Sequence, residues 1–88
     1  MQFSLIQNYP NPFNPRTTIS YELPVNSTVN LAIYNLIGQK VRTLVDSKQQ
    51  AGTYSVSLNA SGLSSGLYFY RLETNKNFVQ VKKMILMK

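Results

Sequence analysis

The chain has 88 residues, with nine Lys and Arg, three acidic residues and no Cys, His or Trp. This length fits a single domain with a thin core, and the lack of Cys and His excludes disulfides, thiolate chemistry and the commonest metal ligand and general base. The net charge of +6 favours an anionic partner, but the cations are scattered without interleaved aromatic residues, so we expect no nucleic-acid binding.

Residues 1–16 are predicted to form a Pro-rich lead-in, because Pro10, Pro12 and Pro15 fix the backbone there. We expect Tyr9 and Phe13 to pack on the domain and the segment to cap a sheet edge, since proline cannot donate to a neighbouring strand. The N-terminus lacks the basic and apolar regions of a signal peptide, and no segment reaches transmembrane length. The protein is therefore expected to be either cytoplasmic or one domain cut from a longer exported protein, with Met1 as a start codon.

Residues 17–88 read as short alternating strands separated by turn residues. The clearest alternation places Tyr54, Val56 and Leu58 on one face, and the slipped pattern near Val41 indicates a bulge or an edge strand. A polar loop is expected over 46–52. The pattern indicates an all-β sandwich or barrel, and we expect a mostly antiparallel β-sandwich of about seven strands. Six of these strands are expected at 17–23, 28–35, 39–45, 53–59, 67–74 and 78–87.

Several residues invite a functional interpretation but fit a structural one better. Four glycines are interpreted as structural turn residues that supply positive φ, namely Gly38, Gly52, Gly62 and Gly66. We expect Leu63 to anchor its loop in the core. Alternation directs Tyr68 and Tyr70 inward and leaves Phe69 alone outside, which is too little for a sugar-stacking platform. With three acids and no His, we expect no catalytic residue, no cofactor and no metal.

The last six residues form a cation, an apolar run and a second cation, namely Lys83, Met84, Ile85, Leu86, Met87 and Lys88. Such a strand can add to the sheet edge of a receptor, with the lysines meeting acidic residues beside it. It can equally be an ordinary core strand whose lysines keep an exposed edge soluble. The residues alone leave both interpretations open.

Five motifs together resemble the C-terminal sorting domain of type IX secretion cargo. They are LIQNYPNPFNP at 5–15, LAIYNLIGQKVRTL at 31–44, AGTY at 51–54, LSSGLYFYRL at 63–72 and KMILMK at 83–88. The resemblance covers nearly the whole chain. One departure is the sequence Leu58-Asn59-Ala60, where many members carry Trp-Asp-Gly, so this loop is not expected to carry a shared function.

The resemblance implies an immunoglobulin-like fold close to that of flagellar hook-capping proteins, at the C-terminus of a larger exported protein. It implies passage through the periplasm and outer membrane to the cell surface or the medium. Implied partners are the type IX translocon, a sortase-like peptidase and an anionic surface glycolipid. It favours translocon recognition at Lys83–Lys88. The alternatives are a carbohydrate-binding or adhesion module, or a structural spacer, on a larger secreted enzyme.

Overall fold

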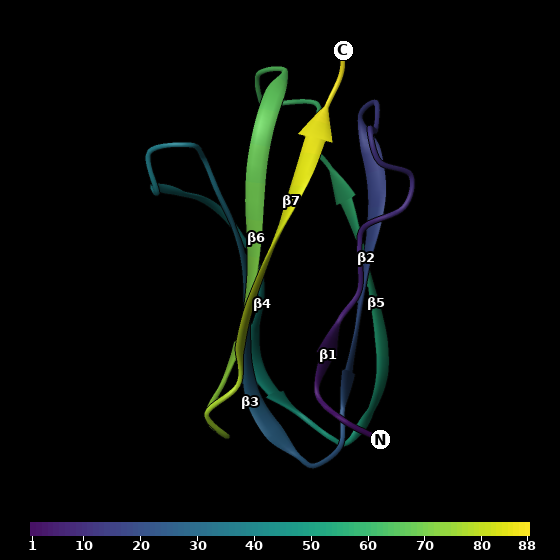
Figure 1. Cartoon of the computed structure of the whole chain (residues 1–88), viewed down its shortest axis with the longest axis vertical. Helices are drawn as coiled ribbons and strands as arrows, with labels where there is room; N and C mark the ends of the chain where they lie inside the picture. Colours follow the sequence, from purple (N-terminus) through teal and green to yellow (C-terminus); the bar gives the residue numbers. More distant parts are fainter.

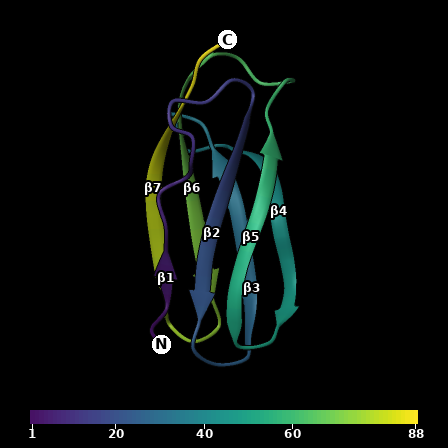
Figure 2. The same cartoon turned by 90° about the vertical axis from the view of Figure 1, so that its right-hand side faces the viewer.

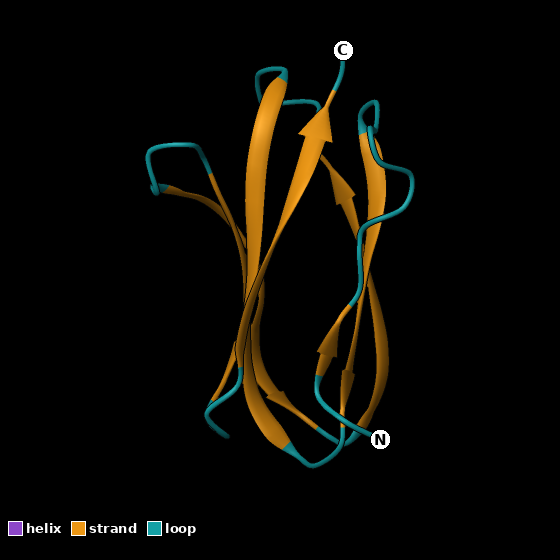
Figure 3. Cartoon of the chain, viewed as in Figure 1, coloured by secondary structure: helices purple, strands orange, loops and turns teal.

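The computed structural model describes residues 1–88 and contains strands and loops only (Figure 1, Figure 3). It has no helix that is long and apolar enough to span a membrane. The strands are β1 (Ser4–Leu5), β2 (Arg16–Leu23), β3 (Ser27–Tyr34), β4 (Lys40–Gln49), β5 (Gly52–Asn59), β6 (Gly66–Thr74) and β7 (Val79–Leu86).

The seven strands form two facing sheets, which confirms the predicted β-sandwich (Figure 1, Figure 2). One sheet has the order β1-β2-β5 and the other has the order β4-β3-β6-β7. Every neighbouring pair is antiparallel. In the second sheet, β4 and β7 are the edge strands, and β7 is also the last strand of the chain.

The core lies between the sheets because alternate side chains of each strand point inward. On β2, Ile19, Tyr21 and Leu23 are all fully buried, while the two residues between them are half-buried. On β6, Tyr70 and Leu72 are likewise fully buried. Phe69 is only half-buried, as its position in the alternation predicted.

One strand boundary was predicted wrongly. Strand β4 continues to Gln49, where we expected a strand ending at 45 and a polar loop over 46–52. Its polar second half pairs with β3, from Asn30 opposite Asp46 to Ser27 opposite Gln49, and then turns directly into β5. Pairing with a neighbouring strand thus overrides the polar composition. The expected bulge is present, because the β3–β4 register shifts between Leu31 and Ala32.

The lead-in, residues 1–16, is built into the sandwich. Its Ser4 and Leu5 form β1, a short strand that the sequence pattern did not predict, and they pair with Glu22 and Tyr21 of β2. Phe13 is 2% exposed, which confirms its expected packing. Tyr9 is 82% exposed, so its expected packing was wrong. The backbone of Tyr9 pairs with exposed Thr18, and paired residues share one face, so the ring points to solvent.

Candidate functional site

Residues 83–88 lie at the C-terminal end of edge strand β7 and just beyond it. Strand alternation divides them between two faces. Met84 is fully buried and Leu86 is 1% exposed, so both belong to the core. Ile85 is 42% and Met87 56% exposed, and Lys83 and Lys88 also face solvent. Recognition by side chains can therefore involve only the outward-facing members of the segment.

The edge of β7 is not open along this segment. The lead-in crosses from β2 to β7 and bridges Phe13 to Leu86 in parallel (Figure 2). The Phe13 N–H donates to the Ile85 carbonyl at 3.0 Å, and the Met87 N–H donates to the Phe13 carbonyl at 2.9 Å. The Asn11 side chain accepts from the Ile85 N–H at 3.0 Å, and Gln7 Nε2 donates to the Lys83 carbonyl at 2.8 Å.

We call this contact between residues 7–13 and 83–87 the seam. It confirms that the lead-in caps a sheet edge. It also joins the N-terminal and C-terminal motifs of the sequence into one continuous surface, and it ties the two sheets together along one open side of the sandwich.

Buried polar groups hold the lead-in in place beneath the seam. The Tyr70 hydroxyl accepts from the Asn8 N–H and donates to the Ile6 carbonyl, both at 2.8 Å. Asn8 is 2% exposed, and its side chain donates to the Thr17 hydroxyl at 3.0 Å. Desolvation by burial raises the pKa of Tyr70 to about 12, although the hydrogen bond from Asn8 opposes the shift. The phenol therefore keeps its proton and can serve as both donor and acceptor.

Lys88 is held by the loop between β5 and β6, although its side chain lies at the surface. Its Nζ donates to the Ser61 carbonyl at 2.7 Å, and its backbone N–H donates to the Ser65 hydroxyl at 3.2 Å. The last residue of the chain therefore has a defined position beyond the end of β7, beside the β5–β6 loop.

The four predicted turn glycines differ in conformation. Gly38, Gly52 and Gly66 have φ values of +86°, +155° and +148°. Gly62 lies in a turn without positive φ, so the conformational reason we expected does not apply to it. Leu63, in the same loop, packs on the core as predicted.

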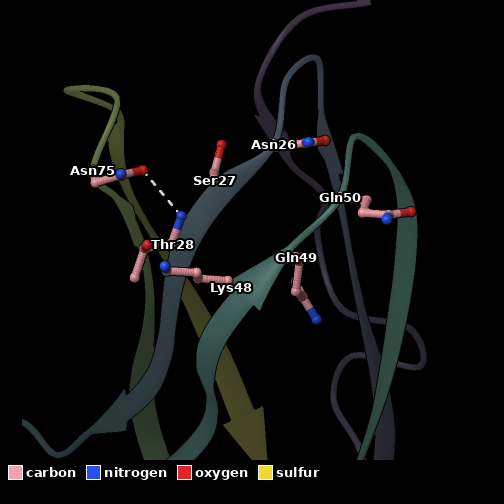
Figure 4. A pocket seen from close by; sticks show the side chains of 7 residues that line it. All are labelled: Asn26, Ser27, Thr28, Lys48, Gln49, Gln50 and Asn75. Atoms are coloured by element: carbon pink, nitrogen blue, oxygen red, sulfur yellow. Dashed lines mark hydrogen bonds between the residues drawn. The ribbon is translucent and has the colours of Figure 1, made fainter.

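A polar hollow of about 290 Å³ lies where the β2–β3 turn meets the end of β4 (Figure 4). Amide, hydroxyl and ammonium groups line it, from Asn26, Ser27, Thr28, Lys48, Gln49, Gln50 and Asn75. Asn75 Oδ1 accepts from the Thr28 N–H at 3.0 Å, and Asn26 Oδ1 accepts from the Ala51 N–H at 2.9 Å. Because these amides satisfy local backbone groups, they serve to order the turns.

The acidic groups are spread over the molecule. Glu22 accepts from the Ser4 hydroxyl at 3.4 Å, and Glu73 forms an ion pair with Arg71 at 3.0 Å. The aromatic residues of β6 are arranged as predicted, with Tyr68 8% exposed and Tyr70 fully buried.

Comparison with known proteins agrees with this arrangement of motifs. The sequence model of one protein family, described as a secretion system C-terminal sorting domain, matches residues 7–87. The chain belongs to this family. The sorting domain is a C-terminal signal for type IX secretion, and it directs export to the cell surface or the medium.

One solved structure shares the fold of the sorting domain. It is a β-glucosidase from Listeria innocua in complex with glucose, with a TM-score of 0.50 and 14% identity. The match covers 99% of the sorting domain but only 16% of the enzyme chain. No curated protein matches the sequence.

Sequence reasoning missed the partners that the sorting domain gives to its own C-terminal strand. Gln7 and Asn11 bind backbone groups of β7 from 74 to 76 residues away in sequence. Polar side chains in a Pro-rich segment carry no pattern that points to a distant strand. The one available signal was Phe13, an aromatic residue between prolines, whose burial was expected.

Proposed function

We propose that the type IX translocon reads the sorting domain as a folded unit, at the surface formed by Lys83, Met84, Ile85, Leu86, Met87 and Lys88. The observation that supports this site is the exposure of four of these side chains: Lys83, Ile85 and Met87 along the outward face of an ordered edge strand, and Lys88 just beyond its end. Met84 and Leu86 contribute indirectly, because their burial fixes the strand. The domain itself is non-catalytic in this proposal and needs no metal or cofactor.

The proposal assigns different roles to the two parts of the chain. Residues 17–88 form most of the sorting sandwich, and the lead-in of residues 1–16, which adds β1 and the buried Phe13, connects it to the exported protein. A sortase-like peptidase then processes the exported protein. The net charge of +6 supports a further contact with an anionic surface glycolipid.

The direct test attaches residues Gln2–Lys88 to a periplasm-targeted fluorescent protein in a host with a type IX system. We expect fluorescence at the cell surface or in the medium, and its loss in a translocon mutant. Retention in the periplasm, in a host that exports its own cargo, contradicts the proposal.

Deleting residues 83–88 is a poor test of recognition, because it removes two core side chains together with the outward ones. The double variant Lys83→Glu, Lys88→Glu leaves the core side chains in place; it changes two exposed charges and removes the surface hydrogen bond from Lys88 Nζ to the Ser61 carbonyl. The matched control, Lys48→Glu with Lys76→Glu, makes the same change in net charge at exposed positions outside the segment. We expect loss of export for the first pair only. If both variants are exported equally, the cations of residues 83–88 take no part in recognition.

A structural spacer is the second candidate, and the β-glucosidase comparison supports it. There, the same fold makes up 16% of a much larger enzyme chain. A spacer role predicts that the wild-type fusion stays in the periplasm and that the two charge variants behave alike.

A further inference from the structure

The seam determines which groups of β7 remain free for a partner. In an antiparallel pair, alternate residues direct their N–H and C=O groups toward the neighbouring strand and away from it. Val81, Lys83, Ile85 and Met87 direct these groups away from β6, since both polar backbone groups of Ile85 bind the lead-in. At the C-terminal end, the Lys83 carbonyl, both Ile85 groups and the Met87 N–H are already paired. Backbone pairing there requires removal of the lead-in.

Removing the lead-in carries a large cost. Phe13, 2% exposed, and Asn8, 2% exposed, would both leave the interior, and the Tyr70 hydroxyl would lose both partners. Transfer of the phenylalanine side chain from core to water is by itself unfavourable. The four hydrogen bonds of the seam would also have to be replaced. The lead-in is thus expected to stay in place when the domain meets a partner.

The side chains on the outer face of β7 remain accessible with the seam closed. We call Lys83, Ile85 and Met87 the outward row; exposed Asn11 and Pro12 of the lead-in adjoin it at the strand edge. Apolar groups of Ile85 and Met87 thereby follow the ammonium group of Lys83 along this face, and Lys88 lies beyond them with its ammonium group on the Ser61 carbonyl. The molecule has one ion pair, Arg71–Glu73, so neither of these lysines has an acidic partner.

We propose that the translocon reads a composite surface, made of the outward row and the lead-in across the closed seam, and that it does not add a strand to the edge of β7. The complementary partner is a protein surface with an apolar centre and an acidic rim. This inference rests on the proposed sorting function. It gives the proline motif a direct part in recognition, since the lead-in supplies one side of the surface and fixes the other.

Two variant pairs in the fluorescent fusion test the composite surface. The first test is the double variant Gln7→Ala with Asn11→Ala, which removes the side-chain hydrogen bonds of the seam but no core residue. Its control is Asn14→Ala, because Asn14 is an exposed lead-in residue without a hydrogen bond to β7. The second is Ile85→Ser, with Val79→Ser as its control on the same face of the same strand, where the two side chains are 42% and 52% exposed.

We expect export to fall about tenfold for each test variant, which is the change in affinity that a loss of about 1.4 kcal/mol of binding free energy produces. Export of each control should stay near the wild-type level. Amide hydrogen exchange of the purified variants checks that the core is intact. If the translocon adds a strand to the edge, loosening the seam raises export and Ile85→Ser has no effect, which overturns the inference. Periplasmic retention of the wild-type fusion instead contradicts the sorting function itself, so the two failures are distinct.

Discussion

The Tyr70 hydroxyl is the polar group on which the lead-in most depends. It lies between the two sheets and forms hydrogen bonds with the backbone on both sides of Gln7. A buried phenol with two partners is stable only while it is neutral, because ionisation would place a charge in the core. This single group therefore links the position of the N-terminal segment to pH.

Replacing Tyr70 with Phe should lower the free energy of unfolding at neutral pH by about 1–3 kcal/mol, because it leaves a buried N–H without a partner. Tyr34→Phe is the control, since the Tyr34 hydroxyl makes no hydrogen bond and is half-buried. Urea unfolding measures both values. Equal losses for the two variants would contradict this role for Tyr70.

The stabilities of wild type and Tyr70→Phe should also respond differently to alkaline pH. The pKa of Tyr70 is about 12 in the folded state against 10.0 ordinarily, so the folded state keeps its proton to higher pH. The resulting stability is complete below pH 10 and is lost as the pH rises to about 12. At about 1.4 kcal/mol per pKa unit, the difference between wild type and Tyr70→Phe should narrow by about 2–3 kcal/mol over that range. A constant difference would contradict the burial argument.

Gly38 is the turn glycine with the clearest backbone requirement. Its φ is +86°, and a Cβ there would meet no other atom, so only backbone strain opposes Gly38→Ala. We expect a loss of about 1 kcal/mol, which lowers the melting temperature of a domain of this size by about 4–8 °C. Gly62→Ala is the control, because its φ is not positive and the nearest side chain, Arg42, lies at 3.8 Å. Its melting temperature should stay close to wild type.

At the scale of elements, β7 differs along its length, because the seam covers only its C-terminal half. The amide hydrogens of Ile85 and Met87 bind the lead-in, whereas those of Val81 and Lys83 point to the edge without a partner. Hydrogen exchange followed by NMR should therefore show slow exchange at the first pair and fast exchange at the second. In Gln7→Ala with Asn11→Ala, the Ile85 amide should exchange faster. Uniform protection along β7 would contradict this description of the edge.

Alternation within a strand could be read from sequence, whereas pairing between distant strands could not. Tyr54, Val56 and Leu58 followed the period of two, which sufficed for the strand boundaries of β5 and its inward face. The second half of β4 has no such pattern, and its strand exists because β3 offers it a partner. The same limit applies to the seam. Phe13 was expected inside, but its β7 partner depends on contacts across most of the chain.

For the molecule as a whole, the net charge of +6 predicts salt-sensitive association with anionic surfaces. We expect the purified domain to bind vesicles that contain anionic lipopolysaccharide at low salt. It should detach toward 1 M salt, where the Debye length is about 3 Å. Vesicles of neutral lipid are the control. Co-sedimentation measures binding, and salt-independent retention or equal binding to neutral vesicles would contradict an electrostatic contact.

The two ends of the chain lie at opposite ends of the longest axis, which measures 37 Å (Figure 1). The domain is therefore polar along its longest axis, with Lys88 at one end and Met1 at the other. A protein joined ahead of Met1 would be separated by the full length of the domain from a partner bound at the C-terminal end. The size, charge and fold of the joined protein would then have little influence on how the partner binds the sorting domain. The same sorting domain can therefore serve many different exported proteins.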